Sequence, residues 1–404
     1  MIKREVEKSI KEVNDTFRVM ALTGPRQVGK TTILKSLMSK DMKIVSLDNE
    51  TYREEAKNNP KFFLETWGKP LFIDEAQYAP ELFPYIKMIV DDDKKRGQFW
   101  LSGSQSFELM KGVSESLAGR VGIIKMNSLT YKEITNNVND RYFNPDKMVE
   151  REEIKANEIF EYIFKGGLPE LYDIPGINRD RFFRSYVDTY IDRDVRLIRN
   201  IGDLVTFEKF MRVMAIRNGK TLVYEDIASD VGVSAHTIKS WVSVLVTSGI
   251  VYLLEPYHNK KIQRLTHMPK IIFMDSGLAC YLAGWTSAKE LQISKESGNY
   301  FETYVISEII KQYENNGVPL NITHFRNKET DEIDLLIEKN MTIYPIEIKK
   351  TSTPKREMFR NFEFLTKNGV KVGNGGIVCL CDKLFKVDEK KILYSIIFCY
   401  RCVI

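Results

Sequence analysis

The chain has 404 residues, which exceeds one ordinary domain and favours two or three. Hydrophobic residues make up 43% and charged residues 28%, so a mostly disordered chain is excluded. The 60 Lys and Arg residues against 55 Asp and Glu residues leave a net charge of +5. That small excess neither requires nor excludes a nucleic-acid partner.

Hydropathy and cysteine content indicate the compartment. No apolar run reaches the roughly 18 residues that a membrane helix needs, and the start MIKREVEKSI lacks the apolar core of a secretory signal. Five cysteines, an odd number, argue against a disulfide framework and favour a reducing compartment. We expect a cytoplasmic protein with no membrane partner.

Residues 1–130 alternate short apolar runs with helical stretches. Runs of four to eight residues predict buried strands at 17–24, 43–48, 70–75 and 98–104, with helices at 31–40 and 81–92 between them. Strands that alternate with helices form βαβ units, so the fold class is α/β with a three-layer parallel sheet. Ligands of such sheets bind beyond the carboxyl ends of the strands.

The segment GPRQVGKT fits the pattern G-x-x-x-x-G-K-[ST] between a predicted strand and a predicted helix. Its glycines let backbone N–H groups face phosphate oxygens, and the helix N-terminus adds a favourable dipole. Lys30 is expected at the β- and γ-phosphates, and Thr31 is expected to ligate Mg²⁺. The predicted ATP-binding residues are Gly24, Pro25, Arg26, Gln27, Val28, Gly29, Lys30, Thr31 and Thr32.

The motif LFIDEAQ supplies the acidic residues that such a site needs. Asp74 ends a predicted buried strand, where a carboxylate that helps to hold Mg²⁺ belongs. Glu75 follows and is the candidate to polarise the attacking water. An adjacent Asp-Glu pair is typical of ATP-hydrolysing proteins when it accompanies the loop above.

Two further motifs offer polar side chains to the same site. QFWLSGSQ places Ser102, Ser104 and Gln105 at a strand end, and one of them, Ser104 in our assignment, is expected to contact the γ-phosphate or the water. SLAGR places Arg120 before an apolar strand. It is a candidate arginine finger or phosphate sensor, and a surface ion pair is the alternative.

The pattern changes after residue 135. Residues 135–152 are polar and Asn-rich and predict a linker, and helical segments follow at 153–164 and 178–199. Residues 224–257 fit a helix-turn-helix with Gly232 in the turn and Ser234 as the cap of the second helix. The expected buried face is Ile227, Ala228, Ile238, Trp241, Val242 and Leu245. Two strands after it would make a winged helix.

A DNA-binding winged helix would present polar side chains on its second helix and basic ones on its wing. These candidates are His236, Thr237, Lys239, Ser240, Lys260, Lys261 and Arg264. The surface is only moderately basic, and winged helices also serve as protein-interaction modules. The sequence therefore leaves DNA and protein partners open.

A cluster of acids marks the C-terminal part, where a helix at 300–314 precedes three strand-like runs. Asp334 lies on one expected strand, and Glu347 and Lys349 share one face of the next. Two carboxylates and a lysine are what metal-assisted phosphodiester hydrolysis requires, with Glu302 as a further candidate ligand for Mg²⁺ or Mn²⁺. The Cys pairs at 379/381 and 399/402 read as core thiols rather than a zinc site.

GPRQVGKTT, LFIDEAQ, WLSGSQSF, SLAGRVG and MDSGLACYL resemble the prokaryotic AAA-type ATPases of uncharacterised role, in which a P-loop ATPase domain is fused to a C-terminal domain of unknown function. The resemblance implies ATP and Mg²⁺ as cofactors, with hydrolysis. Its C-terminal half resembles a winged helix followed by a restriction-endonuclease-like core. The resemblance also implies a second sensor arginine, for which the candidates are Arg184, Arg193 and Arg196.

The sequence thus predicts four parts: an ATPase domain at 1–138, a helical linker or lid at 139–202, a winged helix at 203–275 and a mixed α/β nuclease-like domain at 276–404. The predicted function is Mg-dependent ATP hydrolysis coupled to C-terminal domains that engage DNA, with cleavage of DNA left open. The alternative is a nucleotide-controlled switch that binds a protein partner and carries an inert nuclease-like scaffold. Assembly with further copies of the chain is also left open.

Overall fold

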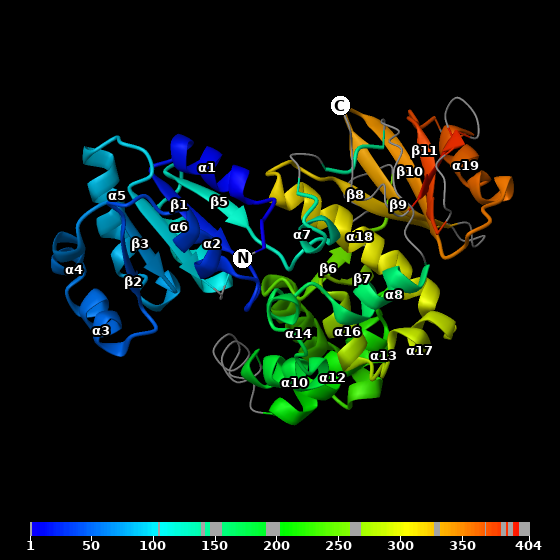
Figure 1. The fold of residues 1–404 in the computed structure, drawn as a ribbon, viewed down its shortest axis with the longest axis horizontal. Helices are drawn as coiled ribbons and strands as arrows, with labels where there is room; N and C mark the ends of the chain where they lie inside the picture. Colours follow the sequence, from blue (N-terminus) through cyan, green and yellow to red (C-terminus); the bar gives the residue numbers. More distant parts are fainter. Residues whose placement is uncertain are drawn as a thin grey trace.

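The computed structural model describes residues 2–103, 106–138, 142–145, 156–190, 203–258, 268–326, 332–367, 369–380, 385–386 and 391–395. These residues form a five-stranded sheet, a helical part with a two-stranded ribbon, and a six-stranded sheet (Figure 1). In the described residues, no helix is both long and apolar enough to cross a membrane.

The first sheet has the strand order β2-β3-β4-β1-β5, and all its neighbouring strands are parallel. Its strands are β1 (Val19–Thr23), β2 (Lys43–Ser46), β3 (Leu71–Asp74), β4 (Phe99–Gly103) and β5 (Val121–Lys125). The four strands predicted between residues 17 and 104 are confirmed. Successive side chains of β1 enter two different hydrophobic clusters, because each face of the sheet is covered.

The helices around this sheet alternate with the strands, as the parallel order requires. They are α1 (Glu7–Thr16), α2 (Lys30–Leu37), α3 (Glu50–Asn58), α4 (Pro60–Trp67), η1 (Ala76–Tyr78), α5 (Leu82–Asp92), α6 (Ser106–Ser116) and α7 (Tyr131–Ile134). The order and the three layers are those of a P-loop α/β fold.

The middle of the chain is mainly helical. Its helices are α8 (Ala156–Lys165), α9 (Glu170–Asp173), α10 (Arg179–Tyr190), α12 (Leu204–Ile216), α13 (Tyr224–Val231), α14 (Ala235–Thr247), α16 (Ser276–Leu282) and α17 (Ala288–Ile293). An antiparallel ribbon of β6 (Val251–Leu254) and β7 (Lys270–Phe273) follows α14. Gly232 ends α13 at φ 90°, and the Ser234 hydroxyl accepts from Thr237 N at 3.1 Å, so the expected turn and cap are confirmed.

The third part is a mixed α/β unit, as expected. Its elements are α18 (Ser297–Asn315), β8 (Ile322–Arg326), β9 (Glu332–Lys339), β10 (Thr342–Lys349), η3 (Arg356–Phe359), α19 (Phe362–Lys367), β11 (Gly375–Cys379), β12 (Phe385–Lys386) and β13 (Lys391–Ser395). The strand order is β12-β13-β11-β10-β9-β8. The pairs β10–β11 and β11–β13 are parallel, and the other pairs are antiparallel.

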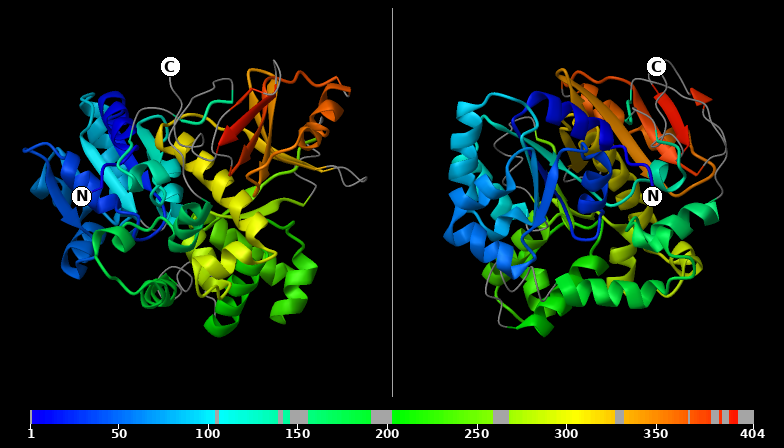
Figure 2. Two further views of the ribbon diagram at one scale, coloured as in Figure 1. Left: turned by 45° about the vertical axis from the view of Figure 1, so that its right-hand side comes forward. Right: turned by 60° about the vertical axis from the view of Figure 1, so that its left-hand side comes forward.

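Helix α18 joins the three parts. Most of its residues are buried, including charged ones, and it contacts β5, β7, β10 and α8. Figures 1 and 2 show it between the first sheet and the six-stranded sheet. Of the predicted linker, residues 139–141 and 146–152 lie outside the described residues. The backbone N–H of Phe143 donates a hydrogen bond to Gln312 Oε1 of α18 at 3.0 Å.

Candidate active site

The loop between β1 and α2 has a backbone that only glycine permits at its first position. Gly24 has φ 143°, and a Cβ atom there would lie 2.0 Å from the carbonyl oxygen of Met126. Gln27 has φ 57° and Gly29 has φ 92° before α2 begins at Lys30. These conformations wrap the chain around the amino end of α2, where unpaired N–H groups favour an anion.

Lys30 is buried within this loop, with 7% of its surface exposed. Its ammonium group donates to the carbonyl oxygens of Gly24 at 2.8 Å and Pro25 at 2.7 Å. The positive charge therefore lies inside the curve of the loop, at the end of a flexible stem. It can turn from these neutral carbonyls to a phosphate, which is a stronger acceptor.

Thr31 and Asp74 meet at the carboxyl end of β3. The Thr31 hydroxyl lies 3.1 Å from each carboxylate oxygen of Asp74, and the Ser102 hydroxyl donates to Asp74 Oδ1. Burial raises the pKa of Asp74, the Ser102 hydrogen bond opposes that rise, and the charge of Glu75 adds to it. A hard cation beside Asp74 would favour the ionised carboxylate, and oxygen donors of this kind suit Mg²⁺.

Glu75 is held in an unusual backbone conformation, with φ 55° and ψ 43°. Its carboxylate accepts from Gln77 Nε2 at 2.5 Å, and Gln77 itself is buried. A left-handed non-glycine residue costs about 1–3 kcal/mol, so the surrounding structure fixes this conformation. Gln77 stands in the motif LFIDEAQ, but only the folded structure shows its contact with Glu75.

Glu75 and the loop line one cavity. Its volume is about 320 Å³, and its lining residues are Arg26, Gln27, Gly29, Lys30, Thr31, Thr32, Glu75 and Thr189. Thr189 comes from α10 in the helical part, and sequence reasoning missed it because it belongs to no motif. A second hollow of about 60 Å³ shares Gly29 and Thr32 with this cavity, and Ile2, Ile33, Leu129 and Pro169 form the apolar part of its lining.

The N-terminal segment clamps the loop from behind. The buried guanidinium of Arg4 donates to Val28 O at 2.7 Å and to Asn127 O at 2.8 Å. It also pairs with the buried carboxylate of Glu133, with Nε 3.0 Å from Oε1. The loop is thus tied to the end of the chain and to α7 by a buried ion pair.

Arg120 does not lie at this cavity. It precedes β5, and its main-chain oxygen accepts from Val19 N, so it lies at the amino end of β1, opposite the loop. Its guanidinium binds both oxygens of Asp91, at 2.7 and 3.0 Å, which raises the pKa of Arg120. As a phosphate sensor for its own chain Arg120 is therefore misplaced, because parallel strands carry it to the opposite edge. A finger for a neighbouring copy stays a prediction.

The remaining predicted site residues either lie away from the cavity or fall outside the described residues. Ser102 contacts Asp74 rather than the cavity, and Arg184 lies near Tyr281 on α16. Ser104, Gln105, Arg193 and Arg196 lie outside the described residues, as do Lys260, Lys261 and Arg264.

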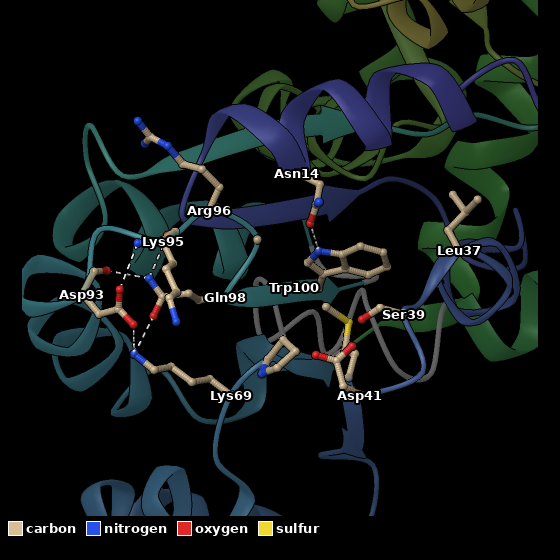
Figure 3. A pocket seen from close by; sticks show the side chains of 13 residues that line it. Asn14, Leu37, Ser39, Asp41, Lys69, Asp93, Lys95, Arg96, Gln98 and Trp100 are labelled. Atoms are coloured by element: carbon tan, nitrogen blue, oxygen red, sulfur yellow. Dashed lines mark hydrogen bonds and ion pairs between the residues drawn. The ribbon is translucent and has the colours of Figure 1, made fainter.

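A larger hollow of about 600 Å³ lies at the amino ends of β2, β3 and β4, beside Trp100 (Figure 3). None of the predicted site residues lines it. Lys69 on its wall is engaged by Asp93 at 2.7 Å and Gln98 at 2.8 Å. The cavity at the loop is smaller, but it holds the residues that fit a triphosphate.

The C-terminal acids converge, as the sequence predicted. Lys349 Nζ lies 3.1 Å from Asp334 Oδ2 and 2.7 Å from Glu347 Oε1, and Ile348 N donates to Asp334 Oδ2 at 2.8 Å. Burial and the charge of Asp334 raise the pKa of Glu347 to about 8. Glu347 Oε2 is buried and has no hydrogen-bond partner among the described residues.

Glu302 on α18 completes this group. Burial and the charge of Asp334 raise the pKa of Glu302 to about 7. Its carboxylate pairs with Lys270 of β7 at 2.8 Å, and Lys270 also lies 2.5 Å from Glu332 Oε1. We call Glu302, Glu332, Asp334, Glu347, Lys270 and Lys349 the acid cluster.

The acid cluster is not arranged as a metal cage. In the part of the chain that the structure describes, no three His, Cys, Asp or Glu side chains converge closely enough to hold a metal ion. Two lysines stand between the acids instead. The residue types still suit a divalent cation, since four carboxylates face two ammonium groups and one buried carboxylate oxygen is unpaired.

The second helix of the helix-turn-helix buries the face that the sequence predicted, including Ile238, Trp241 and Leu245. His236 and Lys239 on its other face are exposed. The carboxyl end of α14 meets the loop, because a Cβ atom on Gly249 would lie 3.1 Å from Pro25 Cγ. Tyr190, next to Thr189, hydrogen-bonds Ser248 at 2.8 Å.

Three family models match the chain. Residues 16–135 match an AAA domain, residues 156–289 a domain of unknown function (DUF8612), and residues 297–398 a domain of unknown function (DUF4143). The AAA-domain match covers the loop, Asp74 and Glu75, and it supports nucleotide binding by this part of the chain.

Known relatives leave the biological role open. Uncharacterized proteins of Mycobacterium tuberculosis and Mycobacterium bovis are each 27% identical over 338 residues, which is 83% of this chain and 71% of theirs. The Walker-type ATPase of Pyrococcus abyssi has a TM-score of 0.43 at 15% identity, over 69% of this chain and 94% of that one. RuvB of Thermotoga maritima has a TM-score of 0.29 at 18% identity, over 66% of this chain and 95% of that one. At these TM-scores the likeness is too partial to bear on function.

Proposed function

We propose that the chain binds ATP with Mg²⁺ at Gly24–Thr32 and hydrolyses it to ADP and phosphate. The observation that carries this proposal is the cavity of about 320 Å³ that joins the amino end of α2, Lys30, Thr31 and Glu75. Backbone N–H groups and Lys30 offer positive partners to the phosphates.

Each side chain has a proposed task in hydrolysis. Thr31 and Asp74 would hold Mg²⁺, which when bound neutralises developing negative charge on the phosphates. Glu75, oriented by Gln77, takes a proton from the attacking water as the water oxygen bonds to the γ-phosphorus. The bond from that phosphorus to the β-phosphate oxygen breaks, and ADP leaves with the electron pair.

The proposal is tested with two variants and a matched control. Lys30→Ala is expected to lose ATP binding in calorimetry, whereas Glu75→Gln keeps binding and loses phosphate release. Lys35→Ala, on the exposed face of the same helix, is expected to behave as the parent. Phosphate release by Lys30→Ala at the parent rate would refute the assignment.

We further propose that nucleotide state is coupled to the C-terminal parts, and that these engage DNA. Support comes from the exposed polar face of α14, whose opposite end touches Pro25, and from the acid cluster with its unpaired Glu347 oxygen. Asp334 and Glu347 would hold Mg²⁺ or Mn²⁺, and Lys349 would stabilise charge on a cleaved phosphodiester. This proposal includes the division of the chain into four parts, with boundaries after residues 138, 202 and 275. It also includes the assignment of residues 203–275 as a winged helix.

Plasmid and single-stranded DNA incubated with Mg²⁺ or Mn²⁺, with and without ATP, test this second proposal. Cleavage that Glu347→Ala abolishes supports a nuclease. Absence of both cleavage and a gel shift at low salt would reject DNA as the partner and favour the alternative, a nucleotide-controlled switch that binds a protein.

A further inference from the structure

Lys270 is an internal cation placed inside the acid cluster by another part of the fold. It belongs to β7, in the ribbon that follows α14, while the acids lie on α18, β9 and β10. Only 4% of its surface is exposed, and its ammonium group lies between Glu302 at 2.8 Å and Glu332 at 2.5 Å. A lysine buried this deeply is held by its partners, since an unpaired buried charge is costly.

The position of Lys270 bears directly on cation binding. It pairs with Glu302 Oε1 at 2.8 Å, and Glu302 is the candidate third ligand beside Asp334 and Glu347. A bound divalent cation favours the ionised form of all four carboxylates, and the cluster then carries two negative charges that its own lysines leave unneutralised. These two negative charges would balance one divalent cation. The buried Glu347 Oε2, which has no hydrogen-bond partner among the described residues, could bind that cation.

The ribbon that carries Lys270 begins at the nucleotide loop. Gly249, in contact with Pro25, leads into β6, and Leu254 at the far end of β6 pairs with Lys270. Five residues of extended chain span ~16 Å, so a stiff two-stranded ribbon links the two sites. Tyr190 and Ser248 tie the same turn to α10, whose Thr189 lines the cavity.

We propose that Lys270 gates the acid cluster: it holds Glu302 away from a divalent cation until the β6–β7 ribbon moves with the nucleotide loop. The competition between Lys270 and a cation for Glu302 involves the acid cluster alone. The control of this competition by nucleotide rests on the proposed ATP site. Lys270 is thus a positioning residue that competes with the metal ion.

The first test measures Mn²⁺ binding to the nucleotide-free full chain by calorimetry. Lys270→Met is expected to bind Mn²⁺ at least tenfold more tightly than the parent, and the gain disappears when Asp334→Asn is added. Lys220→Met is the matched control, because Lys220 is exposed on the segment next to β7. Equal Mn²⁺ affinity in Lys270→Met and the parent would overturn the gate.

A double variant guards against a folding defect. If circular dichroism shows that Lys270→Met does not fold, Lys270→Met with Glu332→Gln removes one charge of each sign and leaves the cluster's total unchanged. Tighter Mn²⁺ binding is still expected, because Glu302 is released. No gain in this folded double variant would likewise overturn the proposal.

The second test adds a non-hydrolysable ATP analogue and follows the Mn²⁺ ion that depends on Asp334. In the parent this ion is expected to bind more tightly with the analogue, and in Lys270→Met equally well with and without it. Unchanged affinity in a parent that binds the analogue would overturn the control by nucleotide. Failure of the analogue to bind at all would instead refute the ATP site, and the nucleotide-free comparison would still decide the gate.

Discussion

Replacement of Arg4 by Met tests how the nucleotide loop is held. The substitution removes a buried guanidinium that contacts Val28 O, Asn127 O and the carboxylate of Glu133, whose side chain is fully buried. Breaking a buried pair by removing one partner costs about 3–5 kcal/mol, because the other charge stays buried without its counter-ion. The N–H groups of Glu5 and Thr130 still donate to the Glu133 carboxylate, which favours the lower end of that range. A loss of this size lowers the melting temperature by on the order of 10 °C.

Thermal unfolding followed by circular dichroism measures this loss, and calorimetry measures the accompanying fall in ATP affinity. The control is Arg212→Met, which breaks a half-exposed pair with Glu208 and should cost less than about 1 kcal/mol. Adding Glu133→Gln to Arg4→Met should restore part of the stability, since no charge then remains buried alone. Equal melting temperatures for Arg4→Met and Arg212→Met would refute the reasoning.

Three further predictions concern the two sites. Gly24→Ala should abolish ATP binding in calorimetry because its Cβ would lie 2.0 Å from a backbone oxygen, whereas Gly232→Ala, at φ 90° in open space, should cost about 1 kcal/mol and leave binding intact. Gln77→Ala should lower kcat about tenfold to a hundredfold with little change in KM, since Glu75 loses its orientation; an unchanged kcat would contradict this role. The raised pKa of Glu347, about 8, makes the metal-free fold hold a proton that the unfolded chain releases near 4.5. The stabilising contribution of Glu347 is therefore fully present below pH 4.5 and is lost as pH rises toward 8, so the urea midpoint should fall less over this range in Glu347→Gln than in the parent.

Much of the first sheet and its loop follows from sequence because the relevant interactions are local. Apolar runs fix the buried strands, and the loop needs glycine and lysine at set spacings from one strand end. Asp74 and Glu75 are found for the same reason, since parallel strands bring their carboxyl ends to one edge. The cluster of Asp334, Glu347 and Lys349 follows from the alternation of side chains on two paired strands.

Other parts of the sites depend on contacts that no local pattern encodes. Arg4 and Glu133 look like surface charges in the sequence, yet tertiary packing buries both. Arg120 ends the motif SLAGR, which suggested a phosphate contact, but its guanidinium forms an ion pair with Asp91 at the opposite edge of the sheet. Lys270 is separated by 32 residues from Glu302, and only the fold shows that a neighbouring ribbon carries it into the acids.

The burial of α18 limits how this chain can be divided. Along one helix, Glu314 binds Lys125 at 3.0 Å, Glu308 accepts from Tyr131 N at 3.0 Å, and Asn315 O accepts from Ser9. A fragment that stopped before residue 297 would leave these donors facing water and would bare the apolar side of β5. We therefore expect the nucleotide-binding part to depend on α18 for its stability. Exchange of this part between homologues should succeed only when α18 and the surfaces it contacts on both sides come from the same protein.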